Sequence, residues 1–261
     1  MDFFILTLLV KAVCTAAVVV GASVAAEKFG PFWGGLIACF PISAGPAYVL
    51  LGLQHDDAFI AASALSSFAS GVVIWAFAIL FVRLGQRYNV WVSLTGTLAV
   101  WLVLALIVRA VPWTLPTAVL ANVVAFMATL KFTPTVTLDT VRRNPAAKAH
   151  WSELPLRAVL VGLFVAVVVT ASDAIGPAAT GIAAVFPIAM SSLAVIMARS
   201  LGMTAARAAI AATVKPMLGI VLGMMVLSQT AVQIGKWPAL LLAFAISMTL
   251  PLLIARYWRR A

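Results

Sequence analysis

The sequence predicts an all-α, polytopic membrane protein with about nine transmembrane helices and an inverted-topology internal repeat. Three observations support this fold class: the composition, a motif that occurs twice at a fixed offset, and an uneven distribution of cations. Of the 261 residues, 64% are hydrophobic and 9% are charged, with a mean hydropathy of +1.15. Soluble domains carry roughly 25% charged residues, so this composition suits lipid rather than water. Continuously apolar stretches such as 158–171 also argue against a transmembrane β-barrel, whose strands alternate.

Nine apolar stretches are each about long enough to cross the hydrocarbon core of a bilayer, which takes about 20 residues. The predicted spans are residues 3–25, 32–53, 58–82, 90–110, 116–132, 155–171, 178–199, 206–228 and 238–257. One long polar link, 133–154, divides the chain. We therefore expect a first membrane repeat at 1–112, a connector span with its cytoplasmic link at 113–153, and a second repeat at 154–261.

A Gly-Pro motif ending in Phe-Pro-Ile marks the start of each repeat. It runs from Gly30 to Ile42 as GPFWGGLIACFPI and returns 146 residues later, from Gly176 to Ile188, as GPAATGIAAVFPI. The same offset relates Trp91 to Trp237. A fixed offset shared by several distinct residue types indicates internal duplication.

The cations predict how the chain is oriented. With Lys11 and Lys215 set aside as intramembrane candidates, thirteen of the remaining fifteen Lys and Arg residues fall on one side of the predicted spans. Only Arg109 and Lys236 fall on the other. Because cytoplasmic loops carry the excess of Lys and Arg, the C-terminus is expected in the cytoplasm and the N-terminus outside. Five spans separate the starts of the repeats, and this odd number inverts one repeat relative to the other.

The two Phe-Pro pairs are the first candidates for a substrate site. Phe40-Pro41 and Phe186-Pro187 each lie about ten residues into a predicted span. Proline removes a backbone donor and clashes with the preceding turn, so it frees carbonyl groups inside the membrane. Such groups are tolerated only against protein or in a wet cavity. A packing kink, with nearby glycines allowing close helix contact, is the structural alternative.

Polar and charged residues within the spans complete the candidate set. Lys215 lies in the middle of an apolar span, where an ionisable residue is a functional candidate by default, and a structural salt bridge is its alternative. Ser191 and Ser192 follow the second Phe-Pro pair and are included in the substrate site. The candidates for gating or ion coupling are Lys11, Arg157, Glu27 and Asp173. Lys11 and Arg157 are related by the repeat, as are Glu27 and Asp173, and helix-end structure is the alternative role for both acids.

Signatures of an enzyme, a metal centre or a nucleic-acid-binding protein are missing from the sequence. The chain has two histidines, and no zinc-ligand spacing, nucleophile elbow or phosphate loop occurs. The net charge of +10 comes from cations at helix ends rather than from one basic face. We therefore expect no catalysis, no cofactor, no metal and no nucleic-acid partner.

Each half resembles the small four-helix GlpM-type bacterial membrane proteins. The resemblance rests on a cation near the start of the first helix followed by Gly34-Gly35-Leu36-Ile37-Ala38-Cys39-Phe40-Pro41-Ile42. It covers about a hundred residues per half and implies membrane residence and a fused, duplicated unit. It implies no substrate. The connector span at 116–132 is where this chain departs from that pattern.

Together these observations predict a small transporter or exporter in a bacterial inner membrane. Inverted repeats rocking about a central site are the architecture of many secondary transporters. Intramembrane cations favour an anionic solute or lipid headgroup as the substrate. The alternative function is a non-transporting accessory or scaffold subunit of a membrane complex. Membrane lipids and a small-molecule substrate are the expected partners, and homo-oligomerisation stays open.

Overall fold

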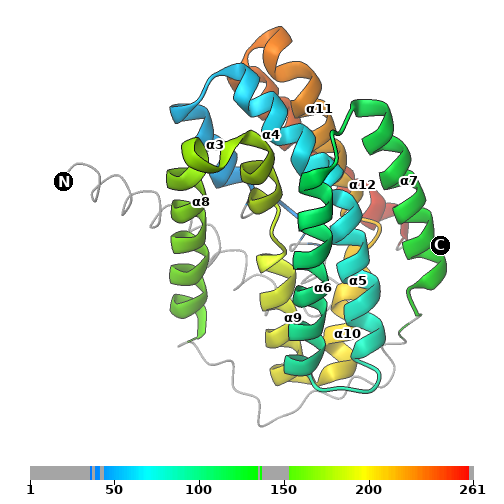
Figure 1. The fold of residues 1–261 in the computed structure, drawn as a ribbon. Helices are drawn as coiled ribbons and strands as arrows, with labels where there is room; N and C mark the ends of the chain where they lie inside the picture. Colours follow the sequence, from blue (N-terminus) through cyan, green and yellow to red (C-terminus); the bar gives the residue numbers. More distant parts are fainter. Residues whose placement is uncertain (1–35, 37–38, 42–43, 135, 137–152, 259–261) are drawn as a thin grey trace.

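The computed structural model describes residues 36, 39–41, 44–134, 136 and 153–258. Every regular element in this part of the chain is an α-helix. The helices are α3 (Ala44–Gln54), α4 (Asp57–Ala69), α5 (Gly71–Leu84), α6 (Val90–Ala110), α7 (Leu115–Phe132), α8 (Glu153–Ala184), α9 (Ile188–Leu201), α10 (Met203–Thr213), α11 (Leu218–Ile234) and α12 (Lys236–Trp258). Figure 1 shows them as one bundle, with α7 and α8 on opposite sides of α4, α5 and α6.

Helix starts and turns follow from local side-chain chemistry. Asp56 caps α4 by accepting a hydrogen bond from the Phe59 amide at 2.8 Å, and Asn89 caps α6 in the same way. Side-chain acceptors at these positions satisfy amides that have no partner within the helix. The tight turns before α10 and α12 are made by Gly202 and Gly235, whose φ angles of +88° and +85° disfavour a side chain.

Six helical stretches among the described residues are long and apolar enough to cross a membrane. They are Asp57–Leu84, Val90–Ala110, Leu115–Phe132, Val161–Arg199, Met203–Ile234 and Lys236–Tyr257. Five of them coincide closely with predicted spans, and the sixth, Val161–Arg199, covers most of the two predicted at 155–171 and 178–199. The predicted span 3–25 and most of 32–43 lie outside the described residues. The protein is therefore helical and has the apolar helices of a membrane-embedded protein, while the total of nine spans stays a prediction.

Burial separates the helices that form the core from those that face outward. In an 18-residue apolar segment of α4 and α5, 67% of the residues are buried inside the protein, whereas in α7 only 17% are buried. The outward face of α7 carries Leu120, Val123, Val124 and Met127, each more than half exposed. An apolar face of this size is expected to contact lipid.

A buried polar side chain, Asn122, fastens the middle of the peripheral α7 to the core. Asn122 donates to the carbonyl oxygen of Phe68 at 2.9 Å and accepts from the indole N–H of Trp75 at 3.2 Å. Both contacts are buried, and the Phe68 carbonyl lies near the α4–α5 junction at Ser70. The predicted connector span is therefore tied to the first repeat by hydrogen bonds as well as by packing.

The two ends of the bundle differ in charge. At one end, which we call the Arg83 end, Arg83 donates to Phe132 O at 3.1 Å and Arg207 to Val82 O at 3.0 Å, while Arg199 lies over the ring of Trp91. At the opposite end, called the Lys236 end, Lys236 lies beside His55 and Asp57. The aspartates whose side chains are described, Asp56, Asp57 and Asp173, all lie at or next to the Lys236 end.

Candidate functional site

The second Phe-Pro pair interrupts the helical chain between α8 and α9. Helix α8 ends at Ala184 and α9 begins at Ile188, so Phe186 and Pro187 lie between them. The Phe186 amide donates back to Ala183 O, and the carbonyl of Pro187 accepts from the Ser191 amide at 2.9 Å. Because proline has no N–H to donate, the helical ladder stops here and restarts one turn later. The predicted break is confirmed.

The first Phe-Pro pair has the same backbone arrangement. Cys39, Phe40 and Pro41 are non-helical, and the carbonyl of Pro41 accepts from the Gly45 amide at 2.8 Å. Gly45 and Ser191 are 146 residues apart, as are the two prolines. Pro41 is buried and Phe40 is half-buried. The residues predicted for the substrate site therefore form two breaks with matching hydrogen bonds.

Aromatic rings surround the second break. Phe186 meets Trp101 of α6 edge to face, with ring centroids 4.9 Å apart, and packs on Phe164 of α8 at 5.2 Å. Ser192 is bonded within its own helix, to Ile188 O. In contrast, the buried Trp101 Nε1 and Ser191 Oγ have no hydrogen-bond partner among the described residues. An unpaired polar atom in a buried site costs about 1–3 kcal/mol, so two at one break call for an explanation.

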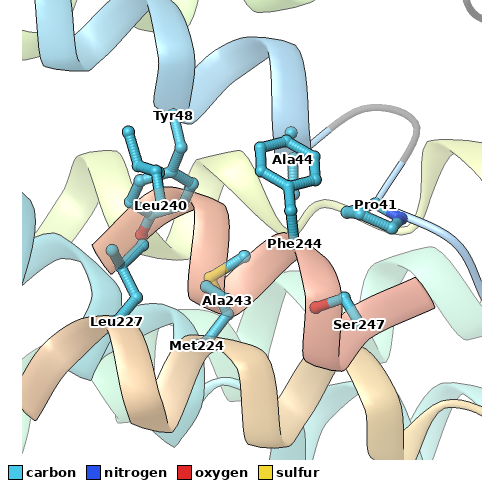
Figure 2. Close-up of a pocket in the computed structure, with 10 residues that line it drawn as sticks. Pro41, Ala44, Tyr48, Met224, Leu227, Leu240, Ala243, Phe244 and Ser247 are labelled. Atoms are coloured by element: carbon cyan, nitrogen blue, oxygen red, sulfur yellow. The ribbon is translucent and has the colours of Figure 1, made fainter. Parts of the chain in front are cut away.

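A small cavity of about 10 Å³ lies beside the first break. Figure 2 shows Pro41 and Ser247 at one side of it and Tyr48 and Leu240 at the other, with Met224 and Leu227 below. Gly45 also lines it. This volume holds about one water molecule. Gly45 and Ser247 lie 146 residues from Ser191 and Trp101 respectively, so in the predicted repeat the cavity corresponds to the position of the two unpaired donors.

A buried hydrogen-bond chain crosses the middle of the bundle. Ser67 Oγ of α4 donates to Gly181 O of α8 at 2.6 Å, and the Tyr48 hydroxyl of α3 lies 2.7 Å from the same Ser67 oxygen. Since Ser67 uses its only proton on Gly181, Tyr48 is the donor to Ser67. Tyr48 also lines the small cavity. The chain joins the helix after the first break to the helix before the second.

Lys215 lies at a third interruption, between α10 and α11. The stretch Val214–Met217 is a turn rather than α-helix, and the Lys215 side chain is exposed. Lys215 is twelve residues after Met203, where α10 starts at the Arg83 end. At the helical rise of about 1.5 Å per residue, this separation is about 18 Å. Cys39 Sγ lies 3.4 Å from Thr213 O. The structure thus brings the Lys215 turn against the first Phe-Pro break, although these segments are more than 170 residues apart.

A cavity of about 620 Å³ opens at the Lys236 end. Its walls come from α4 (Ala62, Leu65, Ser66), from the α6–α7 corner and from the part of α8 that follows its kink at Gly176. Arg109 and Trp113 stand at the corner. Val108 and Ile182 also line this cavity. Trp101 lies two turns before Val108 along α6, and Phe186 lies four residues after Ile182. The second break therefore lies further from the Lys236 end than the cavity does, toward the middle of the bundle.

The gating candidates are only partly described. Asp173 is largely exposed, and its carboxylate lies 3.7 Å from Nδ1 of His55. Lys11 and Glu27 lie outside the described residues. Arg157 falls within α8, but its side chain is likewise not described. No contact between these four residues is therefore on view, and their roles stay predictions.

Sequence reasoning missed Trp101, Tyr48, Arg109 and His55 as members of these sites. Of these residues, only Trp101 could have been identified from the sequence, because an indole N–H in the middle of an apolar span needs a hydrogen-bond partner. Tyr48 and His55 gain their roles only from partners far along the chain. Nothing in a window around them indicates which helix they meet.

Comparison of the chain with protein-family models, curated proteins and solved structures finds no match. What the fold itself defines is a class: a helical protein with membrane-length apolar helices, two of which are interrupted at 185–187 and 214–217, while a further Phe-Pro break precedes α3. Any functional conclusion has to come from the residues at those interruptions.

Proposed function

We propose that this protein is a secondary transporter of a small anionic solute, with its binding site at the second Phe-Pro break. The solute reaches Trp101 and Ser191 through the cavity at the Lys236 end. It then leaves at the Arg83 end after the two halves rock against each other. This mechanism is alternating access, as in other inverted-repeat transporters.

The pair of unpaired donors is the observation that carries the proposal. Trp101 Nε1 and Ser191 Oγ are buried and bond to none of the described residues. An indole N–H is a donor only, and a serine hydroxyl donates as readily as it accepts. A carboxylate or phosphoryl oxygen satisfies both. A bound anion gives both atoms a partner and so removes the energetic penalty of leaving them unpaired.

The surrounding charges favour an anion over a cation. Arg109 stands in the wall of the large cavity, and Lys215 lies at the interruption beside the first break. The aspartates with described side chains lie at the Lys236 end, away from both breaks. A cation site at membrane depth usually needs a carboxylate.

The helix boundaries support the inverted repeat and the four-plus-one-plus-four arrangement. The starts of α4 and α10 are 146 residues apart, and so are the starts of α6 and α12. Packing is exchanged between the halves in a matching way. The first break contacts α12 of the second half, and the second break contacts α6 of the first. This exchange is the pattern expected of two units related by a pseudo-two-fold axis.

The proposed setting is a bacterial inner membrane with the Arg83 end in the cytoplasm. The cations gathered at that end support this orientation through the positive-inside rule. It places the C-terminus in the cytoplasm, the N-terminus outside and the large cavity on the outer side.

Thiol labelling of a Ser191→Cys protein tests the proposal. Cys14 and Cys39 are replaced by alanine, the protein is reconstituted in sealed vesicles, and a membrane-impermeant maleimide is added from one side at a time. Labelling from each side under different conditions is expected. A cysteine at Ala78, which is fully buried within α5, is the matched control and is expected to stay unlabelled.

Two further cysteines give the direction of access. Ser66 lines the large cavity, and Ala212 is its counterpart 146 residues later. Ser66→Cys is expected to react with maleimide from the outer side and Ala212→Cys from the cytoplasmic side. Conditions that speed the labelling of one of these cysteines should slow the labelling of the other. Failure of Ser191→Cys to react from either side, in a folded protein, would replace transport by the accessory-subunit function.

A further inference from the structure

A buried histidine at the Lys236 end contacts residues of three helices, α4, α8 and α12. The imidazole of His55, in the α3–α4 turn, is 7% exposed. Its Nε2 lies 2.6 Å from Ser172 Oγ of α8, and its Nδ1 lies 3.7 Å from the Asp173 carboxylate. Its backbone carbonyl accepts from the ammonium of Lys236 at the start of α12 at 2.6 Å. A turn of the first half is thereby held between two helices of the second.

The hydrogen-bond partners of Ser172 determine which nitrogen of His55 carries a proton. Ser172 Oγ lies 2.6 Å from the carbonyl oxygen of Val169, which accepts but cannot donate. The single hydroxyl proton is therefore used on Val169. His55 Nε2 must then donate to Ser172. In the neutral ring the other nitrogen, Nδ1, has no proton and turns its lone pair toward Asp173.

Neutral His55 thus faces Asp173 acceptor to acceptor, which explains a separation longer than a hydrogen bond. A proton added to Nδ1 turns the same pair into a charge-assisted hydrogen bond, which is typically 2.7–2.9 Å long. The ring is also stacked on Phe59, with centroids 3.6 Å apart, and an aromatic face attracts a cation. Asp173 and Phe59 can therefore both contact a positively charged ring directly.

The other charged groups packed near His55 come from the α3–α4 turn, α4 and α12, while Arg109 lies at the α6–α7 corner. Asp56 and Asp57 lie in the turn and the first turn of α4, and Lys236 lies at the start of α12. Asp56 is engaged as the cap of α4, and Asp57 accepts from the Lys236 backbone amide at 3.2 Å. Asp173 is thus the carboxylate that stands at Nδ1.

We propose that His55 and Asp173 form a proton-binding site that links the turn before α4 to α8 at the Lys236 end. Helix α4 and the part of α8 after Gly176 line the large cavity, and His55 and Asp173 lie in the segments that lead directly into these two walls. Binding a proton draws α8 toward the turn before α4, and releasing it lets them separate. This inference rests on the proposed function, for which it names the proton as the coupling ion.

Double electron–electron resonance, which measures the distance between two spin labels, tests the His55–Asp173 contact in the whole protein without any substrate. Spin labels are placed at Leu53→Cys and Ala174→Cys, both exposed positions, in protein lacking Cys14 and Cys39. Histidine side chains change charge between about pH 5 and pH 8. We expect the distance distribution to be narrower at pH 5 than at pH 8, with a mean shorter by about 1 Å, the contraction from 3.7 Å to a hydrogen bond.

Two single-charge variants separate this pair from general acid effects. Asp173→Asn, at a largely exposed side chain, is expected to abolish the pH dependence. Asp56→Asn removes a charge from the same turn but keeps a capping oxygen, so it should retain the dependence. An unchanged distribution between the two pH values, or a dependence that survives Asp173→Asn, would overturn the proposal.

Nitrogen chemical shifts of the ring test the proton assignment directly. His150→Gln leaves His55 as the single histidine. With ¹⁵N-labelled histidine at pH 8, the proton is expected on Nε2, and a proton on Nδ1 would refute the arrangement. The labelling of Ser191→Cys tests the transport function separately. The two experiments therefore distinguish a pH-dependent His55–Asp173 contact in a protein that does not transport from transport that does not depend on this contact.

Discussion

The hydroxyl of Ser67 donates to the carbonyl oxygen of Gly181 at 2.6 Å, while its own oxygen accepts from Tyr48. This contact joins α4 of the first half to α8 of the second at the depth of the helix breaks. Two buried groups, the Tyr48 hydroxyl and the Gly181 carbonyl, depend on one serine for their hydrogen bonds. The stability of the central region is therefore sensitive to that side chain.

Ser67→Ala is expected to lower the free energy of unfolding by about 1–2 kcal/mol, because it leaves two buried polar groups unpaired. Ser93→Ala is the control. Ser93 is equally buried, but its hydroxyl has no partner among the described residues, so its removal should cost less than about 0.5 kcal/mol. Unfolding by a denaturing detergent in mixed micelles measures both. Equal losses would contradict the role assigned to Ser67.

Gly181→Ala is expected to separate α8 from α4. A methyl group on Gly181 would overlap the backbone carbonyl of Ser63, which cannot rotate away, and overpacking of this kind costs about 1–3 kcal/mol or more. Gly96→Ala in α6 meets only the flexible end of Leu84 at 3.4 Å, so it should be neutral or stabilise the helix by up to about 1 kcal/mol. Thermal unfolding in detergent compares them, and a stable Gly181→Ala protein would count against the close approach.

Asn122→Leu is expected to loosen α7 from the core, because the Trp75 indole loses its partner and the Phe68 carbonyl loses one of its donors, at a cost of about 1–3 kcal/mol. Thr129→Val on the same helix removes only a local bond to Ala125 and serves as the control. Hydrogen–deuterium exchange of peptides from 115–132 should rise in the first variant and not in the second. Slow exchange in both would show that packing alone holds α7.

Two buried tryptophans are expected to respond differently to replacement by phenylalanine. Both variants lose similar volume, but Trp75 Nε1 is hydrogen-bonded to Asn122 whereas Trp101 Nε1 bonds to none of the described residues. Trp75→Phe should therefore be the less stable variant by about 1–2 kcal/mol. Their thermal midpoints measure the difference. A Trp101→Phe protein as unstable as Trp75→Phe would mean that the Trp101 indole is already paired, and would weaken the proposed binding site.

Sequence reasoning reached the helix breaks because their cause is local. Proline lacks an N–H and so weakens a helix at its own position, and the offset of 146 residues between Phe40-Pro41 and Phe186-Pro187 indicates that the two breaks belong together. Helices at 90–110 and 115–132 were equally accessible, since they are bounded by Asn89, Pro112 and Thr114 and consist of long apolar runs.

The contacts at the site are not local, and this is why they could not be predicted. Lys215 was placed in the middle of a span, but no pattern in its neighbours shows that Thr213 would meet Cys39. His55 and Asp173 are separated by four apolar helices in the chain and pair through the packing of α8 on α3 and α4. Hydrophobic periodicity specifies which face of a helix is apolar, not which helix covers it.

The exchanged packing at the breaks has a consequence for how such a chain assembles. Pro41 is enclosed by Phe244 and Ser247 of α12, and Phe186 by Trp101 of α6. Each break takes part of its covering from the other half, so one stretch of about 110 residues alone would leave that part of the unwound backbone facing lipid, where it is not tolerated. In the inverted repeat that we propose, a gene encoding a single unit would produce a complete site only by inserting its product into the membrane in both orientations and pairing the two forms. The connector α7 would make that pairing automatic, because it joins the two oppositely oriented units in one chain.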